Sequence, residues 1–258
     1  MIRGGEPTGS KATHRQHDGA ASDSERGTPL SCASSGTPLS CASSGAALSS
    51  ASSQRCELWG VLNVTPDSFS DGGQFLAIDA ALRHARAMLA AGADVIDVGG
   101  ESTRPRGATY GAGYVAVTLD EELRRVLPVV ERLAADGVRV SIDTTKAEVA
   151  RRALVLGAQI VNDVSCGRDA ALLRVAADAG AELVLMHSRG TGQVTAATAK
   201  YDDVVAEVRA ELMAAVERAL AAGLARANIW IDPGLGFAKT PAQSLVLLAG
   251  TQDLVATG

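Results

Sequence analysis

Short apolar runs alternate with longer amphipathic stretches from residue 57 to the end of the chain. Six runs are rich in Val, Ile and Leu without polar alternation, which is typical of strands covered on both faces of a parallel sheet. The stretches between them repeat apolar residues at helical spacing, so the pattern predicts successive βα units. The predicted strands are 58–62, 95–98, 138–142, 159–161, 183–186 and 229–231. The predicted fold class is α/β, a TIM-type (β/α)8 barrel of which only about six units are present.

Local signals place the ends of several predicted helices. A Thr followed three residues later by Glu forms a capping box, and a glycine after an apolar face ends a helix in a left-handed conformation. Pro128 lies inside one predicted helix and is expected to kink it. The expected starts are Thr118 with Glu121, Thr145 with Glu148, and the pair Thr240 and Pro241, and the expected ends are Gly92 and Gly223.

The first 56 residues have a different composition. Residues 27–35 read GTPLSCASS, residues 36–44 repeat this letter for letter, and residues 45–53 are a degraded third copy. No aromatic residue precedes Trp59, and small polar residues cannot bury enough apolar surface to offset the entropy of ordering. We predict a disordered low-complexity tail over residues 1–56 and a barrel domain over 57–258. Because the cysteines form no C-x-x-C pair, neither a disulfide framework nor a zinc site is expected.

Composition favours a small-molecule ligand. The chain has 258 residues, a formal net charge of −5 and no basic run of the kind that tracks nucleic acid. No stretch approaches the roughly 18 continuous apolar residues of a membrane helix, and the start lacks the apolar core of a signal peptide. A cytoplasmic protein that binds neither nucleic acid nor membrane is therefore expected.

Polar residues follow all six predicted strands. In a barrel the carboxyl ends of the strands converge on one mouth, where side chains distant in sequence become neighbours. Each residue alone has a simpler interpretation, since Asp143 could cap the next helix and Asp232 could open a turn. Six independent caps explain the pattern less well than one site does. The segments concerned begin at Asn63, Gly99, Asp143, Asn162, His187 and Asp232.

Several of these segments carry longer motifs. They read NVTPDSFSDGG at 63–73, GGESTRP at 99–105, SIDTTK at 141–146, VND at 161–163, LMH at 185–187 and DPGLGFAK at 232–239. In this order the motifs resemble the dihydropteroate synthase family of pterin-binding enzymes, over about residues 57–258. Two positions depart from the family pattern, Ala238 where glycine is expected and Ser188 where methionine is usual. The family's Ser-Arg-Lys and Arg-x-His elements do not occur, so we expect a barrel that is truncated at its C-terminus, with the activity of this chain left open.

The resemblance implies a transferase of folate biosynthesis. It would condense 4-aminobenzoate with (7,8-dihydropterin-6-yl)methyl diphosphate, giving 7,8-dihydropteroate and diphosphate with Mg²⁺ as cofactor. Two alternatives stay open, another pterin-binding enzyme such as a methyltetrahydrofolate methyltransferase module, and an inactive pterin-binding remnant. Family members form homodimers through late helices, which the expected truncation removes.

The resemblance also implies roles for individual residues. Asn63 matches the magnesium position, and Asn63, Asp143 and Asp232 form the catalytic set. His187 could be a hydrogen-bonded barrel residue or a ligand contact, and Lys239 could lie near the mouth or in solvent. The pterin diphosphate would contact Thr103, Asp143, Asn162 and Asp232, and the loops that close on 4-aminobenzoate would contribute Thr65, Pro66, Asp67, Ser68, Phe69 and Arg104.

Overall fold

The computed structural model describes residues 2–3, 56–64, 73–101, 117–190 and 194–257. By their contacts, residues 1–6 group with residues 57–258, and residues 7–56 form a separate unit. The repeats of the predicted tail lie outside the described residues, so the tail and the domain boundary at residue 57 stay predictions.

In the described part of the chain, the sheet contains six parallel strands in sequence order from β2 to β7, as the apolar runs predicted, and a seventh, antiparallel strand at its edge. Each strand lies within two residues of its predicted bounds. The strands are β2 (Trp59–Asn63), β3 (Val95–Gly99), β4 (Val140–Asp143), β5 (Ile160–Asp163), β6 (Glu182–Met186) and β7 (Ile229–Asp232). A two-residue strand, β1 (Ile2–Arg3), pairs antiparallel with the outer edge of β7, although it falls within the range predicted as a tail.

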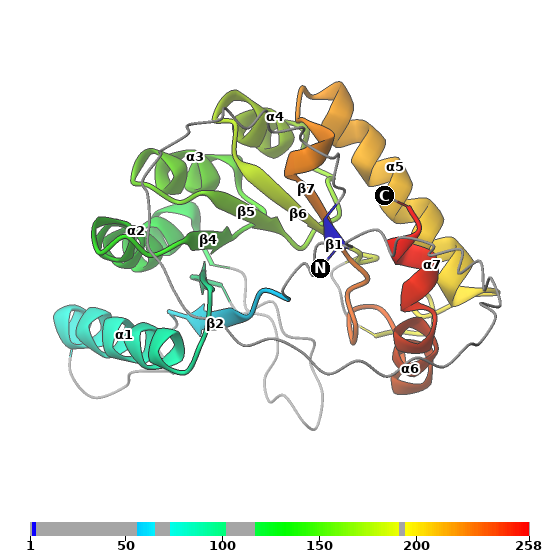
Figure 1. Ribbon diagram of the computed structural model, residues 1–258, viewed down its shortest axis with the longest axis horizontal. Helices are drawn as coiled ribbons and strands as arrows, with labels where there is room; N and C mark the ends of the chain where they lie inside the picture. The colour runs from blue at the N-terminus through cyan, green and yellow to red at the C-terminus, as the bar shows by residue number, and fades with distance from the viewer. Residues whose placement is uncertain (1, 4–55, 65–72, 102–116, 191–193, 258) are drawn as a thin grey trace, which may run out of the picture. The chain divides into compact units, whose positions relative to one another are not determined.

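Helices follow the strands in turn, and α1 to α5 lie along one face of the curved sheet in Figure 1. This arrangement confirms the predicted α/β class with repeated βα units. The helices are α1 (Gly73–Ala90), α2 (Leu119–Ala135), α3 (Ala147–Val155), α4 (Ala170–Asp178), α5 (Val204–Ala221), α6 (Pro241–Ala249) and α7 (Thr251–Val255), with a short 3-10 turn, η2 (Arg226–Asn228), ahead of β7.

Most predicted helix ends are confirmed. The Thr118 side chain accepts a hydrogen bond from the Glu121 backbone N–H, and α2 continues through Pro128 to Ala135. Gly92 and Gly223 both have a φ of 104°, the left-handed conformation expected of them. Thr240 begins α6 with a complete capping box to Gln243 and with Pro241 in the first turn.

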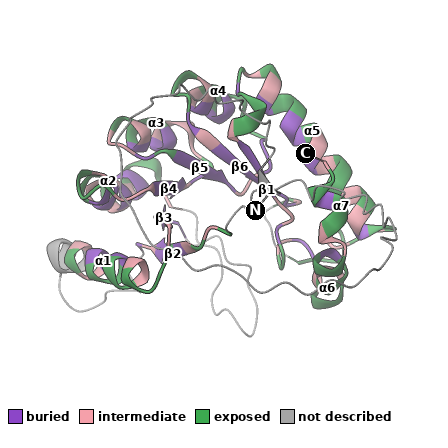
Figure 2. Cartoon of the chain, viewed as in Figure 1, coloured by how far each residue is buried: buried purple, intermediate pink, exposed green. Residues whose placement is uncertain are grey.

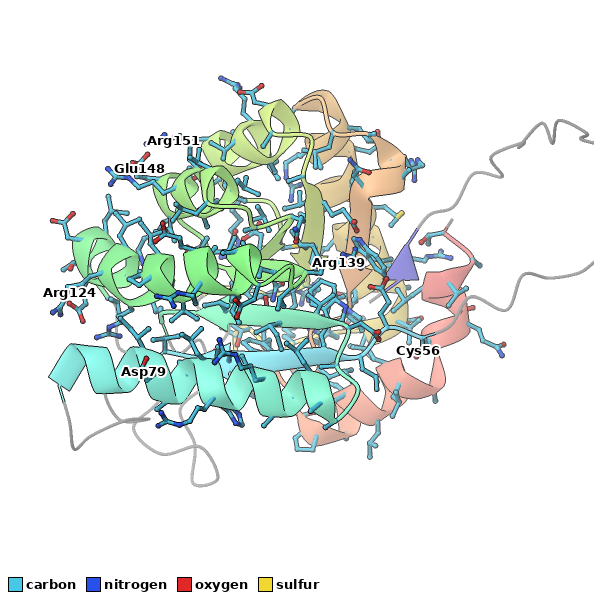
Figure 3. The ribbon with its side chains drawn as sticks, turned by 60° about the vertical axis from the view of Figure 1, so that its left-hand side comes forward. Cys56, Asp79, Arg124, Arg139, Glu148 and Arg151 are labelled. Carbon is cyan, nitrogen blue, oxygen red and sulfur yellow. The ribbon has the colours of Figure 1, made fainter. Side chains whose placement is uncertain are left out.

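The predicted cap at Thr145 and Glu148 is wrong. Helix α3 begins after Lys146. The backbone N–H of Lys146 donates a hydrogen bond to the Thr144 hydroxyl oxygen at 3.1 Å. Glu148 points outward and pairs with Arg151 and Arg152 on the helix surface (Figure 3). Lys146 is the N-cap residue and its side chain forms no cap hydrogen bond, so the Thr144 hydroxyl bonds within the turn that precedes the helix.

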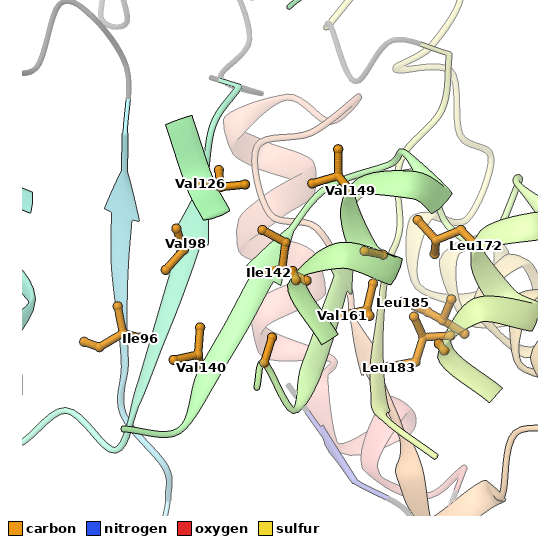
Figure 4. Close-up of a cluster of buried hydrophobic side chains, with 14 of the residues drawn as sticks. Ile96, Val98, Val126, Val140, Ile142, Val149, Val161, Leu172, Leu183 and Leu185 are labelled. Atoms are coloured by element: carbon orange, nitrogen blue, oxygen red, sulfur yellow. The ribbon is translucent and has the colours of Figure 1, made fainter. Parts of the chain in front are cut away.

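The main core lies between the sheet and its helices. Alternate strand residues such as Ile96, Val98, Ile142 and Leu185 face the helices, where Val126 of α2 joins them (Figure 4). All five of these side chains are fully buried. Figure 2 shows this buried layer under the exposed outer surfaces of the helices. The packing fixes which strand residues must point to the opposite face, since neighbours alternate along a strand.

The opposite face of the sheet carries a second, smaller apolar cluster. It contains Val95, Ile160, Val184 and Trp230, with Trp59 packed against them. Trp59 of β2 and Trp230 of β7 meet edge to face, with ring centroids 6.2 Å apart. The first and last parallel strands therefore curl toward each other at this level.

Ion pairs surround the amino ends of the strands. Arg139 bonds Glu57 at 2.8 Å and Glu182 at 2.7 Å (Figure 3). Glu182 in turn accepts from the Trp230 indole N–H at 2.5 Å. Apolar side chains and paired charges therefore fill the interior of the sheet at the amino ends of the strands. A binding site is expected at the carboxyl ends instead.

Candidate functional site

The polar residues predicted at the strand ends lie side by side in the sheet. Across the parallel register, Asn63 pairs with Gly99, Gly99 with Asp143 and Asp143 with Asn162. Asp232 ends β7, opposite Met186. The strand pairing thus brings Asn63, Asp143 and Asn162 to one level of the sheet, while Asp232 ends the strand at its far side.

Two close contacts define the interior at this level. The Asn162 amide donates from Nδ2 to Asp97 Oδ2 at 2.9 Å. Gly99 lies under the Asp143 carboxylate, because a Cβ added to Gly99 would stand 3.2 Å from Asp143 Oδ2. Glycine at this position leaves room for the carboxylate on the inner face of the sheet.

The pKa values of the carboxyl groups at this level are raised. Burial raises the pKa of Asp143 well above its usual range, and the nearby Asp97, Glu122 and Asp163 add to the shift. Burial also raises the pKa of Asp97, opposed by Ser141 and Asn162. Several carboxyls that resist ionisation together are characteristic of a binding or catalytic site.

Three buried polar atoms on β3 and β4 have no hydrogen-bond partner in the described part of the chain. They are Asp97 Oδ1, Ser141 Oγ and Asp143 Oδ1. An unpaired buried polar group costs about 1–3 kcal/mol, so a ligand that donates hydrogen bonds to them would recover that energy. The arrangement suits a flat molecule with several N–H donors along one edge.

The turn after β7 is built around Lys239. Asp232 Oδ1 accepts from the Gly234 backbone N–H at 2.8 Å, which opens the turn. The Lys239 ammonium donates to the Gly234 carbonyl at 3.0 Å and to the Phe237 carbonyl at 2.9 Å. Its side chain is only 1% exposed, so the solvent interpretation of Lys239 is wrong. Burial lowers the pKa of Lys239 to about 8.

Ala238 stands in the same turn, where the family pattern has glycine. Its φ is 53° and it is fully buried. The left-handed conformation costs a residue with a side chain roughly 1–2 kcal/mol, which explains why glycine is the usual residue there. No contact of Ser188 explains the other departure.

His187 is hydrogen-bonded within the protein through both ring nitrogens. Nε2 lies 2.9 Å from Glu211 Oε2, and Nδ1 lies 2.9 Å from the Lys239 ammonium. Because an ammonium only donates, Nδ1 accepts and Nε2 carries the proton. Of the two interpretations of His187, the structure supports the hydrogen-bonded barrel residue.

The free energy of unfolding should fall as the pH drops from 6.5 toward 4, with His187 contributing. Burial and Lys239 lower the pKa of His187 from 6.5 to about 4, so the unfolded chain takes up a proton that the folded chain resists. In urea titrations at several pH values, His187→Gln should flatten this fall, whereas His84→Gln on the exposed face of α1 should not. An unchanged slope in His187→Gln would contradict the assignment.

Charged residues anchor the start of the second loop. The Lys146 ammonium pairs with Glu101 and with the buried Glu122. The Thr144 hydroxyl donates to Glu122 at 2.6 Å, and Arg125 donates to the Gly100 carbonyl at 2.8 Å. These contacts fix the last described residues before the segment that carries Thr103 and Arg104.

Seven predicted site residues lie outside the described residues. They are Thr65, Pro66, Asp67, Ser68 and Phe69 in the first loop and Thr103 and Arg104 in the second. The sequence analysis did not identify Asp97 and Glu122 as parts of the surrounding network. The signal for Asp97 was a carboxylate in the middle of an otherwise apolar strand, since such a group is seldom buried without a function.

No cluster of three or more His, Cys, Asp or Glu that could hold a metal occurs among the described residues. Within the same residues, no helix is long and apolar enough to cross a membrane.

Comparison with known proteins identifies the family. The sequence profile of the pterin binding enzymes matches residues 59–258. The dihydropteroate synthase of Mycobacterium leprae is 53% identical over 201 residues, which cover 77% of this chain and 68% of the relative.

Solved structures agree with the sequence match. The dihydropteroate synthase of Xanthomonas albilineans with 4-aminobenzoic acid is 44% identical, with a TM-score of 0.70 over 78% of this chain and 69% of that one. The same organism's enzyme in complex with 7,8-dihydropteroate gives a TM-score of 0.68 at 40% identity, over 80% of this chain and 70% of that one. These relatives favour a synthase over the methyltransferase alternative. The chain therefore belongs to the pterin binding enzymes and, within them, to the dihydropteroate synthases, the transferases that act in folate biosynthesis.

Proposed function

We propose that Asn63, Asp143, Asn162 and Asp232 form the substrate site at which this chain carries out dihydropteroate synthesis. The substrates would be 4-aminobenzoate and (7,8-dihydropterin-6-yl)methyl diphosphate, in keeping with the 4-aminobenzoic acid and 7,8-dihydropteroate bound in the X. albilineans enzyme. The main support is the group of unpaired buried acceptors beside Asn162 on the inner face of the sheet.

The pterin ring would dock with its donor edge toward these acceptors. A pterin presents a 2-amino group and ring N–H groups along one edge, and carboxylate and amide oxygens accept such donors in fixed geometry. Asp143 offers the unpaired Oδ1, and Asn162 offers its amide oxygen because its nitrogen is bonded to Asp97. Asp232 would contact the ring from the far side of the site.

Mg²⁺ would bind at Asn63 together with the substrate. The donor chemistry fits, because Mg²⁺ keeps most of its waters and needs one or two protein oxygens when a substrate phosphate supplies the others. When bound, the ion would offset the negative charge that develops on the departing diphosphate. Asn63 ends β2, where its amide oxygen could serve as the protein ligand that the ion shares with the diphosphate.

The remaining chemistry is positioning. The amino group of 4-aminobenzoate is already nucleophilic, so the protein needs to align it with the pterin methylene carbon and exclude water. We assign this closure to Thr65, Pro66, Asp67, Ser68, Phe69 and Arg104, with Thr103 at the diphosphate, on the motif resemblance alone. The homodimer and the cytoplasmic location stay predictions.

Dihydropteroate formation by Asn63→Ala should need at least about tenfold more Mg²⁺ than the unchanged chain, because one protein ligand is lost. Asn63→Asp keeps an oxygen ligand and should retain the response to Mg²⁺. The product is measured by chromatography over a Mg²⁺ series. Equal Mg²⁺ requirements in Asn63→Ala and the unchanged chain would remove Asn63 from the metal site, and no product from any chain would refute the proposed function.

A further inference from the structure

Asp97 is the unexpected charge in this site. It lies in the middle of β3, two residues before the strand end, and its side chain faces the interior beside Asn162. We propose that Asp97 is a positioning residue that fixes the amide of Asn162 in the orientation that pterin recognition requires. This inference rests on the proposed function, since it concerns the same site.

A carboxylate can hold the amide in only one orientation. In the structure Asn162 Nδ2 donates to Asp97 Oδ2 at 2.9 Å, and an ionised Asp97 can only accept, so it holds the NH₂ of the amide on its own side. The amide oxygen is then directed away from Asp97. Without Asp97 the amide could rotate and present its NH₂ to the donors of the pterin edge, where two donors would repel each other.

Within the described residues, the polar side chains beside Asp97 that favour its ionised form are Ser141 and Asn162, and the hydrogen bond comes from Asn162. Asp97 is 4% exposed, and its neighbours in register are Val61 on β2 and Ser141 on β4. Among the described residues no Lys, Arg or His forms an ion pair with it, and its Oδ1 has no hydrogen-bond partner. The nearby Asp232 carboxylate repels it.

We expect the Asp97 carboxyl group to lower the stability of the fold, because it is buried and no ion pair with it occurs among the described residues. Removing an ionisable group that is buried without a counter-charge is often neutral or stabilising. A residue kept only for stability would be apolar at this point of the strand, as Val95 and Val98 are. Asp97 is therefore expected to have two separate effects. It lowers the stability of the folded chain, and it orients the amide of Asn162.

The test uses the full chain and two substitutions. Asp97→Ala should weaken binding of (7,8-dihydropterin-6-yl)methyl diphosphate by about tenfold, because the bond that orients the amide is lost. The melting temperature of Asp97→Asn should be equal to or above that of the unchanged chain, because this variant removes the buried charge and keeps an acceptor for the Asn162 NH₂. Asp97→Asn offers an oxygen that can accept from Asn162 Nδ2, so its affinity should stay within about threefold of the original.

A double-mutant cycle shows whether Asp97 acts through Asn162. If it does, Asp97→Ala combined with Asn162→Ala should bind no more weakly than Asn162→Ala alone, within about twofold. Isothermal titration gives the affinities, and thermal unfolding gives the melting temperatures.

The outcomes separate the alternatives. Unchanged affinity in Asp97→Ala, or losses that add in the double variant, would overturn the positioning role. A lower melting temperature together with weaker binding in both Asp97→Ala and Asp97→Asn would make Asp97 a residue of the fold and would also overturn it. If the unchanged chain binds no pterin while remaining folded, the proposed function fails, and this inference fails with it.

Discussion

Asp143→Asn should raise the melting temperature of the chain at neutral pH and weaken pterin binding by about tenfold to a hundredfold. The loss of affinity follows from replacing one charged acceptor of the donor edge, a contact of about 1.5–3 kcal/mol. The gain in stability follows because Asp143 Oδ1 is buried without a partner in the described part of the chain, among other carboxyl groups. Thermal unfolding and isothermal titration of the same protein give both results.

The pH dependence makes this prediction more specific. Because the pKa of Asp143 is raised above 3.8 in the fold, the unfolded chain loses this proton first as the pH rises. The contribution of Asp143 to stability is therefore greatest below pH 3.8 and declines as the pH rises to the folded pKa. Asparagine does not titrate, so the advantage of Asp143→Asn should grow from acid toward neutral pH.

Asp178→Asn is the matched control, because it makes the same change at an exposed position on α4. It should alter neither the affinity nor the pH dependence of stability. If Asp143→Asn melts below the unchanged chain at neutral pH, Asp143 is a stabilising residue of the core, and its assignment to the substrate site loses its physical basis.

Gly234→Ala should lower the free energy of unfolding by more than about 3 kcal/mol, a loss that is exceptional for one methyl group. A Cβ at Gly234 would stand 2.1 Å from the backbone oxygen of His187, and this oxygen cannot rotate away as a side chain could. The φ of 63° adds left-handed strain. The β7 turn would have to move, and Asp232 would move with it because its Oδ1 is bonded to the Gly234 N–H.

Gly236→Ala separates the clash from the strain. Gly236 has a φ of 83°, yet a Cβ there would meet nothing within 4 Å. It should therefore cost only the left-handed strain of roughly 1–2 kcal/mol and leave pterin affinity almost unchanged. Urea unfolding of the two variants measures the difference. Equal losses would show that the close approach of the turn to His187 is not what holds Asp232.

The local pattern of apolar and polar residues was sufficient to predict the strands and the positions of four residues of the candidate site. Buried parallel strands are continuously apolar, so the first polar residue after each run marks the end of the strand or its approach. Asn63, Asp143 and Asp232 end their strands, and Asn162 lies one residue before the end of β5. The register of the sheet then places Asn63, Asp143 and Asn162 side by side without any further information.

Contacts between residues far apart in sequence could not be predicted from the local pattern. Nothing near Lys239 in sequence shows that its ammonium reaches His187, 52 residues earlier. The bond between Asp97 and Asn162 joins two strands that are not adjacent in the sheet, so neither residue's neighbours in sequence predict it. At Thr145 a capping motif was present, but the path of the chain from β4 into α3 makes Lys146 the N-cap residue, and its side chain forms no cap hydrogen bond.

The central claim is that the carboxyl ends of the parallel strands bind the pterin substrate through buried carboxyl groups. Isothermal titration of the 258-residue chain with (7,8-dihydropterin-6-yl)methyl diphosphate and Mg²⁺ tests it most directly, beside a variant that combines Asp143→Ala with Asp232→Ala. We expect saturable binding at one site by the unchanged chain and no detectable binding by the double variant when both are folded. Equal binding by the two chains, or none by the folded unchanged chain, would contradict it.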